Sequence, residues 1–305
     1  MPGDSLNTNN SAAPVYGTGF SASSKPAPPI DLETDQTDYS AVSTFVILTI
    51  LGLLMLKNPL FRFIRRKQVG LILNQYDWFY HSILEKNIPY YSKLSFEEQQ
   101  RFLRRTVAFM KSKRFHYYDM KEEPQVPLLI SAAAVQLSFG LKHYLLKEFD
   151  TIHVLSGNYR FAGLPVAFEG HVSESDIFIS WESFVKSFED YSDGNNVGLH
   201  EMAHALSKVN ADVETPEDEL FAQLFKKFNQ IARPVFYEIQ TDPYSFLGAY
   251  AATNMYEFWA VCVEQFFERP HAFQIHHGRL YEAMTILLNQ DPLQPQIILE
   301  PIDNE

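Results

Sequence analysis

NNVGLHEMAHALSKVNAD, residues 195–212, is the most informative segment of the chain, because it carries two histidines four positions apart. On an α-helix, residues at positions i and i+4 lie one above the other on the same face, so His200 and His204 can direct two imidazole nitrogens at one metal ion. Glu201 would then lie beside a water molecule bound to that ion. The spacing therefore predicts a zinc hydrolase whose metal site is built on this helix.

The residues around this motif predict that its helix is buried. Most of them are apolar or small: Val197, Gly198, Leu199, Met202, Ala203, Ala205 and Leu206. Burying two histidines and a glutamate without partners would carry a large desolvation cost, whereas metal coordination satisfies all three groups. The context therefore favours a metal site over two unrelated histidines on a helix surface.

A catalytic zinc usually has three protein ligands and one open position for water, so a third ligand is required. The segment FLGAYAATNMYEFWAVCVEQFFERP, residues 246–270, offers Glu257 and Glu264 among large apolar side chains. Tyr250, Glu257 and Glu264 are seven residues apart, nearly two helical turns, so a helix would present them on one face. The spacing leaves Glu257 and Glu264 as competing candidates for the third ligand.

Other acids and histidines are weaker candidates for that ligand. His276 and His277 are adjacent, so their side chains diverge on a helix. An acidic run is typical of a solvated helix start, and here it comprises Glu214, Glu217, Asp218 and Glu219.

The overall composition excludes several classes of protein. A hydrophobic content of 46% over 305 residues is that of a globular chain and excludes wholesale disorder. The net charge of -12 argues against direct binding of nucleic acid over a broad surface. The single cysteine, Cys262, excludes an internal disulfide and a cysteine-based structural zinc site.

The N-terminal part of the chain differs from the rest. Residues 1–38 are rich in Ser, Asn, Pro and Gly, which predicts a disordered tail. Ala41 to Leu56 carry no charge, and this run is at the short end of the roughly 17 to 25 residues of a spanning helix. We expect a single transmembrane anchor over residues 39–57. A buried core helix and a cleaved signal peptide are the alternatives, and an acidic region before the run disfavours the signal peptide.

Charges around this run predict its orientation. Basic residues follow it in the juxtamembrane segment 58–67, and acids precede it. Positive charge beside a spanning helix favours the cytoplasmic side. We therefore expect a protein of the cytoplasmic membrane, with the catalytic domain facing the cytoplasm.

Residues 68–305 are long enough for one domain, and no repeat or linker divides them. Ser95 and Glu98 form a capping-box pattern, and residues 126–146 predict a buried helix. Two β-rich runs, 151–155 and 176–181, predict strands, the second of which could pair with an extended peptide by edge addition. The expected class is α+β, mainly helical with a small sheet.

Three segments together resemble the zinc-dependent peptidases of the Mlc titration factor A family: GLHEMAHAL (198–206), GAYAATNMYEFWAVCVEQFFERP (248–270) and LLNQDPL (287–293). The resemblance extends from about Ser95 to Leu293. It implies a zincin-like metallopeptidase domain with His200, His204 and Glu257 as ligands of Zn²⁺. It also implies Glu201 as the catalytic base and Tyr250 as a transition-state donor, and leaves Glu264 as a bracing residue.

The chain departs from this family at Ser207, where relatives commonly have an aspartate shortly after the second histidine. The loss of that carboxylate affects how the groups around the metal are oriented.

These expectations combine into one predicted function. The chain would be a membrane-anchored zinc peptidase that hydrolyses peptide bonds in a peptide or protein substrate. The alternative is a regulatory binding protein that sequesters a transcriptional repressor, as the family name implies, with zinc structural or switch-like. A third possibility is a membrane-anchoring structural protein without metal, which does not account for the motif from His200 to His204.

Overall fold

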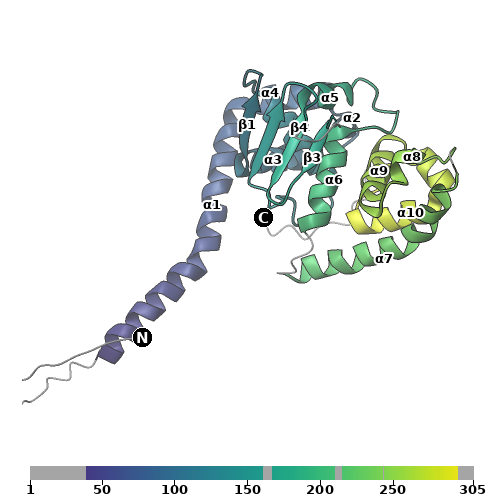
Figure 1. The fold of residues 1–305 in the computed structure, drawn as a ribbon. Helices are drawn as coiled ribbons and strands as arrows, with labels where there is room; N and C mark the ends of the chain where they lie inside the picture. The colour runs from purple at the N-terminus through teal and green to yellow at the C-terminus, as the bar shows by residue number, and fades with distance from the viewer. Residues whose placement is uncertain (1–38, 161–166, 210–214, 243, 295–305) are drawn as a thin grey trace, which may run out of the picture. The chain divides into compact units, whose positions relative to one another are not determined.

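The computed structural model describes residues 39–160, 167–209, 215–242 and 244–294 (Figure 1). Two compact units are present, Met1–Met55 and Leu56–Glu305, and the second contains the sheet and all the candidate site residues. The predicted disordered tail, residues 1–38, lies outside the described residues.

The first helix, α1 (Tyr39–Asn87), differs from the predicted membrane anchor. None of the helices in the described parts of the chain combines the length and the apolar character needed to cross a membrane. The uncharged run from Ala41 to Leu56 is shorter than the about 20 residues that a span needs, and the same helix continues through Arg65, Arg66 and Lys67. The predicted single-pass anchor over 39–57 is therefore wrong, together with the membrane location and orientation that depended on it.

Four strands form one mixed sheet in the order β1-β2-β4-β3. β1 (Arg114–Tyr118), β2 (Thr151–Leu155) and β4 (Asp176–Ser180) are parallel, and β3 (Gly170–Val172) is antiparallel to β4. β2 and β4 confirm the two predicted strands. Because β4 pairs on both sides, the expectation that it offers a free edge is wrong; among the described strands, β1 and β3 lie at the two edges of the sheet.

The helices before the metal motif pack around one core. Those that follow α1 are α2 (Pro89–Ser92), α3 (Phe96–Ser112), α4 (Gln125–Ser138) and α5 (Trp181–Lys186). The predicted capping box begins α3: Glu98 N donates to Ser95 Oγ over 3.4 Å, and Ser95 N donates to Glu98 Oε2 over 3.0 Å. The helix predicted over 126–146 ends early, at Ser138. Gly140 follows, where a Cβ would lie 2.2 Å from the Asn289 carbonyl oxygen, so only glycine fits this close approach.

The metal motif forms α6 (Val197–Val209), which contacts α4, α9 and the β3–β4 end of the sheet. The chain continues with α7 (Pro216–Ile239), α8 (Gly248–Ala251), α9 (Met255–Glu268) and α10 (Pro270–Leu288). The prediction of an α+β domain, mainly helical with a small sheet, is confirmed. Its core lies between the sheet and the helices, and α6 is part of it.

Candidate metal centre

The start of α6 is fixed by Asn196, which is fully buried. Its side-chain Oδ1 accepts a hydrogen bond from Leu199 N at 2.9 Å, and its carbonyl oxygen accepts one from His200 N at 2.8 Å. This is an N-cap, which satisfies a backbone donor that the first helical turn otherwise leaves unpaired. Gly198 permits close packing, because a Cβ there would lie 2.6 Å from the Phe184 ring. The cap and the packing together set the position of the two histidines.

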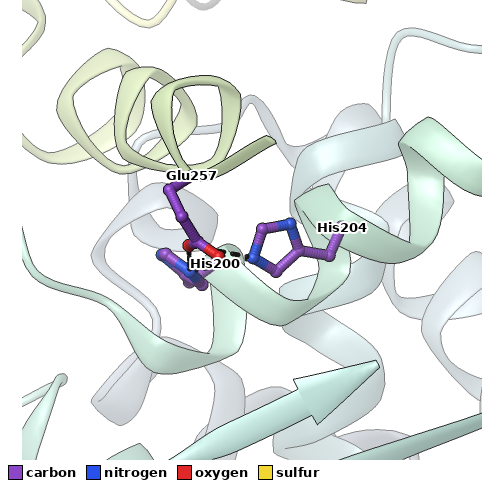
Figure 2. A group of neighbouring side chains, drawn as sticks. All are labelled: His200, His204 and Glu257. Atoms are coloured by element: carbon purple, nitrogen blue, oxygen red, sulfur yellow. Dashed lines mark hydrogen bonds and ion pairs between the residues drawn. The ribbon is translucent and has the colours of Figure 1, made fainter. Parts of the chain in front are cut away.

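His200, His204 and Glu257 converge at one point (Figure 2). The Nε2 atoms of the two histidines are 3.0 Å apart, and Glu257 Oε2 lies 3.0 Å from His200 Nε2 and 3.3 Å from His204 Nε2. Two imidazole nitrogens and one carboxylate oxygen are the donor set of a common class of catalytic zinc site. The geometry therefore brings together the three residues named from the sequence, and these residues could hold a metal ion.

Glu257 reaches this point from the first turn of α9. Asn254 caps that helix, because its Oδ1 accepts hydrogen bonds from Tyr256 N at 2.9 Å and from Glu257 N at 3.0 Å. A carboxylate in a first helical turn is also favoured by the helix dipole. The buried Trp259 donates its Nε1 hydrogen to the Ala203 carbonyl oxygen at 2.9 Å, which ties α9 to α6.

Glu201 lies beside this group in a buried position, with 5% of its surface exposed. Within the described residues its Oε2 has no hydrogen-bond partner, an unusual state for a buried carboxylate oxygen. Burial raises the pKa of Glu201 to about 8, since the neighbouring His200 only partly offsets burial and the carboxylates of Glu257 and Glu264 add to it. The first residue of β3, Gly170, passes so close that a Cβ would lie 2.4 Å from Glu201 Oε1.

The charges at the centre favour a cation. Burial lowers the pKa of His200, but hydrogen bonds to Glu257 and Glu264 outweigh it and raise that pKa to about 10. Burial also opposes ionisation of Glu257, yet hydrogen bonds from both histidines hold its pKa well below the usual range. The pKa of His204 is lowered by burial. The carboxylates therefore stabilise positive charge between the two rings.

Glu264, the competing candidate from the sequence, lies on the other side of His200. Its Oε2 is 3.4 Å from His200 Nδ1, and its Oε1 accepts a hydrogen bond from Asn196 N at 2.9 Å. One helical turn later, Glu268 accepts hydrogen bonds from Asn196 Nδ2 at 2.9 Å and Gly194 N at 3.1 Å. The sequence motifs did not identify Glu268 or Asn196. The position of Glu268, four residues after Glu264 on one helix face, was the available signal.

Tyr250, on α8, lies near the centre and is 59% exposed. Its ring centroid is 5.8 Å from that of His200. Partial burial and the Glu257 carboxylate raise the pKa of Tyr250 to about 12, so its hydroxyl is protonated at neutral pH and can donate a hydrogen bond.

The weaker candidates lie elsewhere. His276 stacks on Phe246 with ring centroids 4.8 Å apart, and Asp218 pairs with His143 over 2.8 Å. Glu217 forms an ion pair with Lys142, and Glu214 lies outside the described residues. The motifs also did not identify Tyr256, whose ring stacks on that of His204 with centroids 3.9 Å apart.

Comparison with known proteins agrees with this geometry. A family model described as glucose-regulated metallo-peptidase M90 matches residues 61–287. An uncharacterized protein of Synechocystis sp. is 24% identical over 233 residues, which cover 70% of this chain and 84% of that protein. Mlc titration factor A of Cronobacter sakazakii is 24% identical over 235 residues, 68% of this chain and 84% of the relative. Mlc titration factor A of Escherichia coli is 30% identical over 129 residues, 40% of this chain and 47% of the relative.

The family match, together with a two-histidine, one-glutamate group that could hold a metal ion, places the chain in the metallopeptidase class. The chain belongs to the glucose-regulated metallopeptidase M90 family, to which the resemblance to the Mlc titration factor A proteins had pointed. That prediction is confirmed.

Proposed function

We propose that this protein is a zinc-dependent peptidase with a zincin-like site, in which His200, His204 and Glu257 bind Zn²⁺ and Glu201 is the general base. The observation that carries the proposal is the convergence of the three ligand atoms beside a buried glutamate whose Oε2 has no hydrogen-bond partner in the described chain. The donor set suits zinc, which accepts imidazole and carboxylate ligands readily.

Zinc bound there would lower the pKa of a water molecule towards about 7 and polarise the carbonyl group that the water attacks. Glu201 would accept a proton from that water and donate it to the leaving amine, so that one carboxylate would act first as base and then as acid. Burial raises the pKa of Glu201 above its usual value, which makes its carboxylate a stronger base for this exchange.

A peptide substrate fits the strand next to the site. β3 lies at one edge of the sheet that the described strands form, and its Gly170 lies against Glu201. An extended peptide can add to such an edge through backbone hydrogen bonds. The absence of a side chain at Gly170 lets this edge come close to the catalytic group.

The direct test is the zinc content of the full chain, purified without chelator, together with cleavage of an unstructured protein substrate. We expect about one zinc ion per chain, with cleavage lost after chelation and restored by added zinc. Exposure of the same protein to magnesium in place of zinc is the control. A chain that binds no zinc, and cleaves nothing when zinc is added, would contradict the proposal.

Tyr250→Phe tests the proposed donor to the oxyanion. A preorganised donor is worth about 10²–10³-fold in kcat, and we expect about 10- to 100-fold here because water can partly replace an exposed hydroxyl. KM and zinc content should change little. Tyr244→Phe, on a side chain that is 93% exposed, is a matched control. A change in KM alone would remove Tyr250 from the chemical step.

A second candidate function is suggested by the relatives named Mlc titration factor A, a name that attributes titration of Mlc to them. By analogy, this chain would bind a regulatory protein. Peptidase activity and such binding are compatible, and the variant Glu201→Gln distinguishes between them.

A further inference from the structure

The two histidines of α6 are held in different ways. His200 has the Glu264 carboxylate 3.4 Å from its Nδ1, an arrangement that fixes the ring and its tautomer. His204 Nδ1 is buried, and in the described residues it has no hydrogen-bond partner. The ring of Tyr256 lies over the His204 ring instead, with centroids 3.9 Å apart and an interplanar angle of 10°.

Tyr256 is itself fixed at both ends. Its backbone N–H donates to the Asn254 cap at 2.9 Å, and its hydroxyl lies 3.4 Å from the His204 carbonyl oxygen. Ser207, at the position where relatives commonly have an aspartate, donates to the same carbonyl at 2.8 Å. Rotation of the ring away from His204 would lose the stacking and the long contact between the hydroxyl and the His204 carbonyl oxygen.

The position of Tyr256 also links two of the three ligand residues. Tyr256 directly precedes Glu257, and the Asn254 side chain accepts hydrogen bonds from both of their backbone N–H groups. One helix cap thus sets the Glu257 carboxylate and the ring that covers His204. A planar ring in parallel contact restricts rotation of the imidazole about χ2, the torsion that aims Nε2.

We infer that Tyr256 is a positioning residue for the metal site, which orients His204 by ring stacking where His200 is oriented by a carboxylate. This inference rests on the proposed zinc site and names a residue that supports it without touching the metal.

The test compares Tyr256→Leu with Tyr256→Phe in the full chain. The zinc dissociation constant is measured by competition with a chromophoric chelator. Loss of a group that orients a ligand typically weakens metal binding by about 10–100-fold, and we expect about tenfold for Tyr256→Leu. Tyr256→Phe retains the ring and should stay within about threefold of the unchanged protein, because the 3.4 Å contact of the hydroxyl is long.

Phe246→Leu is the matched control, because it also removes a ring stacked on a histidine, His276, outside the site. Its zinc affinity should equal that of the unchanged protein. The visible spectrum of the Co²⁺-substituted protein gives a second readout: it should change for Tyr256→Leu and not for Tyr256→Phe. Unfolding of the metal-free variants checks that each is folded.

The outcomes are distinct. Equal zinc affinity of Tyr256→Leu and the unchanged protein would overturn the inference while the zinc site stands. An equal loss in Tyr256→Phe would assign the effect to the hydroxyl and also overturn it. An unchanged protein that binds no zinc would overturn the proposed function and this inference with it.

Discussion

Glu201→Gln is expected to lower the turnover of peptide hydrolysis by about 10²–10⁴-fold while zinc remains bound, because glutamine has nearly the same shape but cannot accept the proton. The substitution suits a pocket in which Gly170 leaves no spare room around the side chain. It also removes a carboxylate whose ionisation burial disfavours, so the fold should tolerate it. The measurement is kcat on an unstructured protein substrate beside zinc per chain.

Glu282→Gln, on the exposed side of α10, is the matched control and should leave both quantities unchanged. Turnover that survives in Glu201→Gln would show that another group serves as base. If Glu201→Gln loses turnover but keeps a measured interaction with a regulatory protein, binding is separate from catalysis. If both are lost while zinc remains, the interaction depends on cleavage.

The centre of the site could be predicted from the sequence because its geometry is local. Two histidines four residues apart converge on any α-helix, so His200 and His204 needed no knowledge of the tertiary fold. The Ser95 capping box was predictable for the same reason, since all its groups lie within one turn.

Features that depend on contacts between distant segments could not be predicted in this way. β3 has only three residues, and its position beside Glu201 follows from pairing with β4. The end of α4 depends on the chain near Asn289, which packs against Gly140. The misplaced anchor came from a short uncharged run and the charges around it, which do not show that this run is part of a longer helix.

The choice between Glu257 and Glu264 shows the same limit at the site itself. A spacing of seven residues places both glutamates on one face of α9, but it does not show which of them lies beside the Nε2 atoms of the two histidines. The Asn254 cap and the Trp259 contact with Ala203 place the first turn of α9 over both Nε2 atoms. Glu264 consequently lies on the opposite side of the His200 ring, where it faces Nδ1.

This difference predicts unequal effects for the two glutamates. Glu257→Ala should abolish stoichiometric zinc binding and with it hydrolysis, because it removes one of the three proposed ligands and leaves two histidines facing each other. Glu264→Gln keeps an oxygen that can accept from Asn196 N, so zinc should still bind, with an affinity lower by about 10–100-fold. Zinc per chain and the zinc dissociation constant, measured for both variants, decide the matter.

Unfolding measurements on the metal-free variants add an independent distinction. Glu264 is 4% exposed, and Glu264→Leu would leave Asn196 N and His200 Nδ1 without this acceptor, at about 1–3 kcal/mol for each buried group left unpaired. Glu257 is partly exposed to solvent, so Glu257→Ala should destabilise the metal-free protein less than Glu264→Leu does. The same substitution should abolish zinc binding. If Glu264→Gln loses as much zinc as Glu257→Ala, Glu264 would be the third zinc ligand instead of Glu257. Only the loss of a direct ligand explains a complete loss of zinc from so small a change.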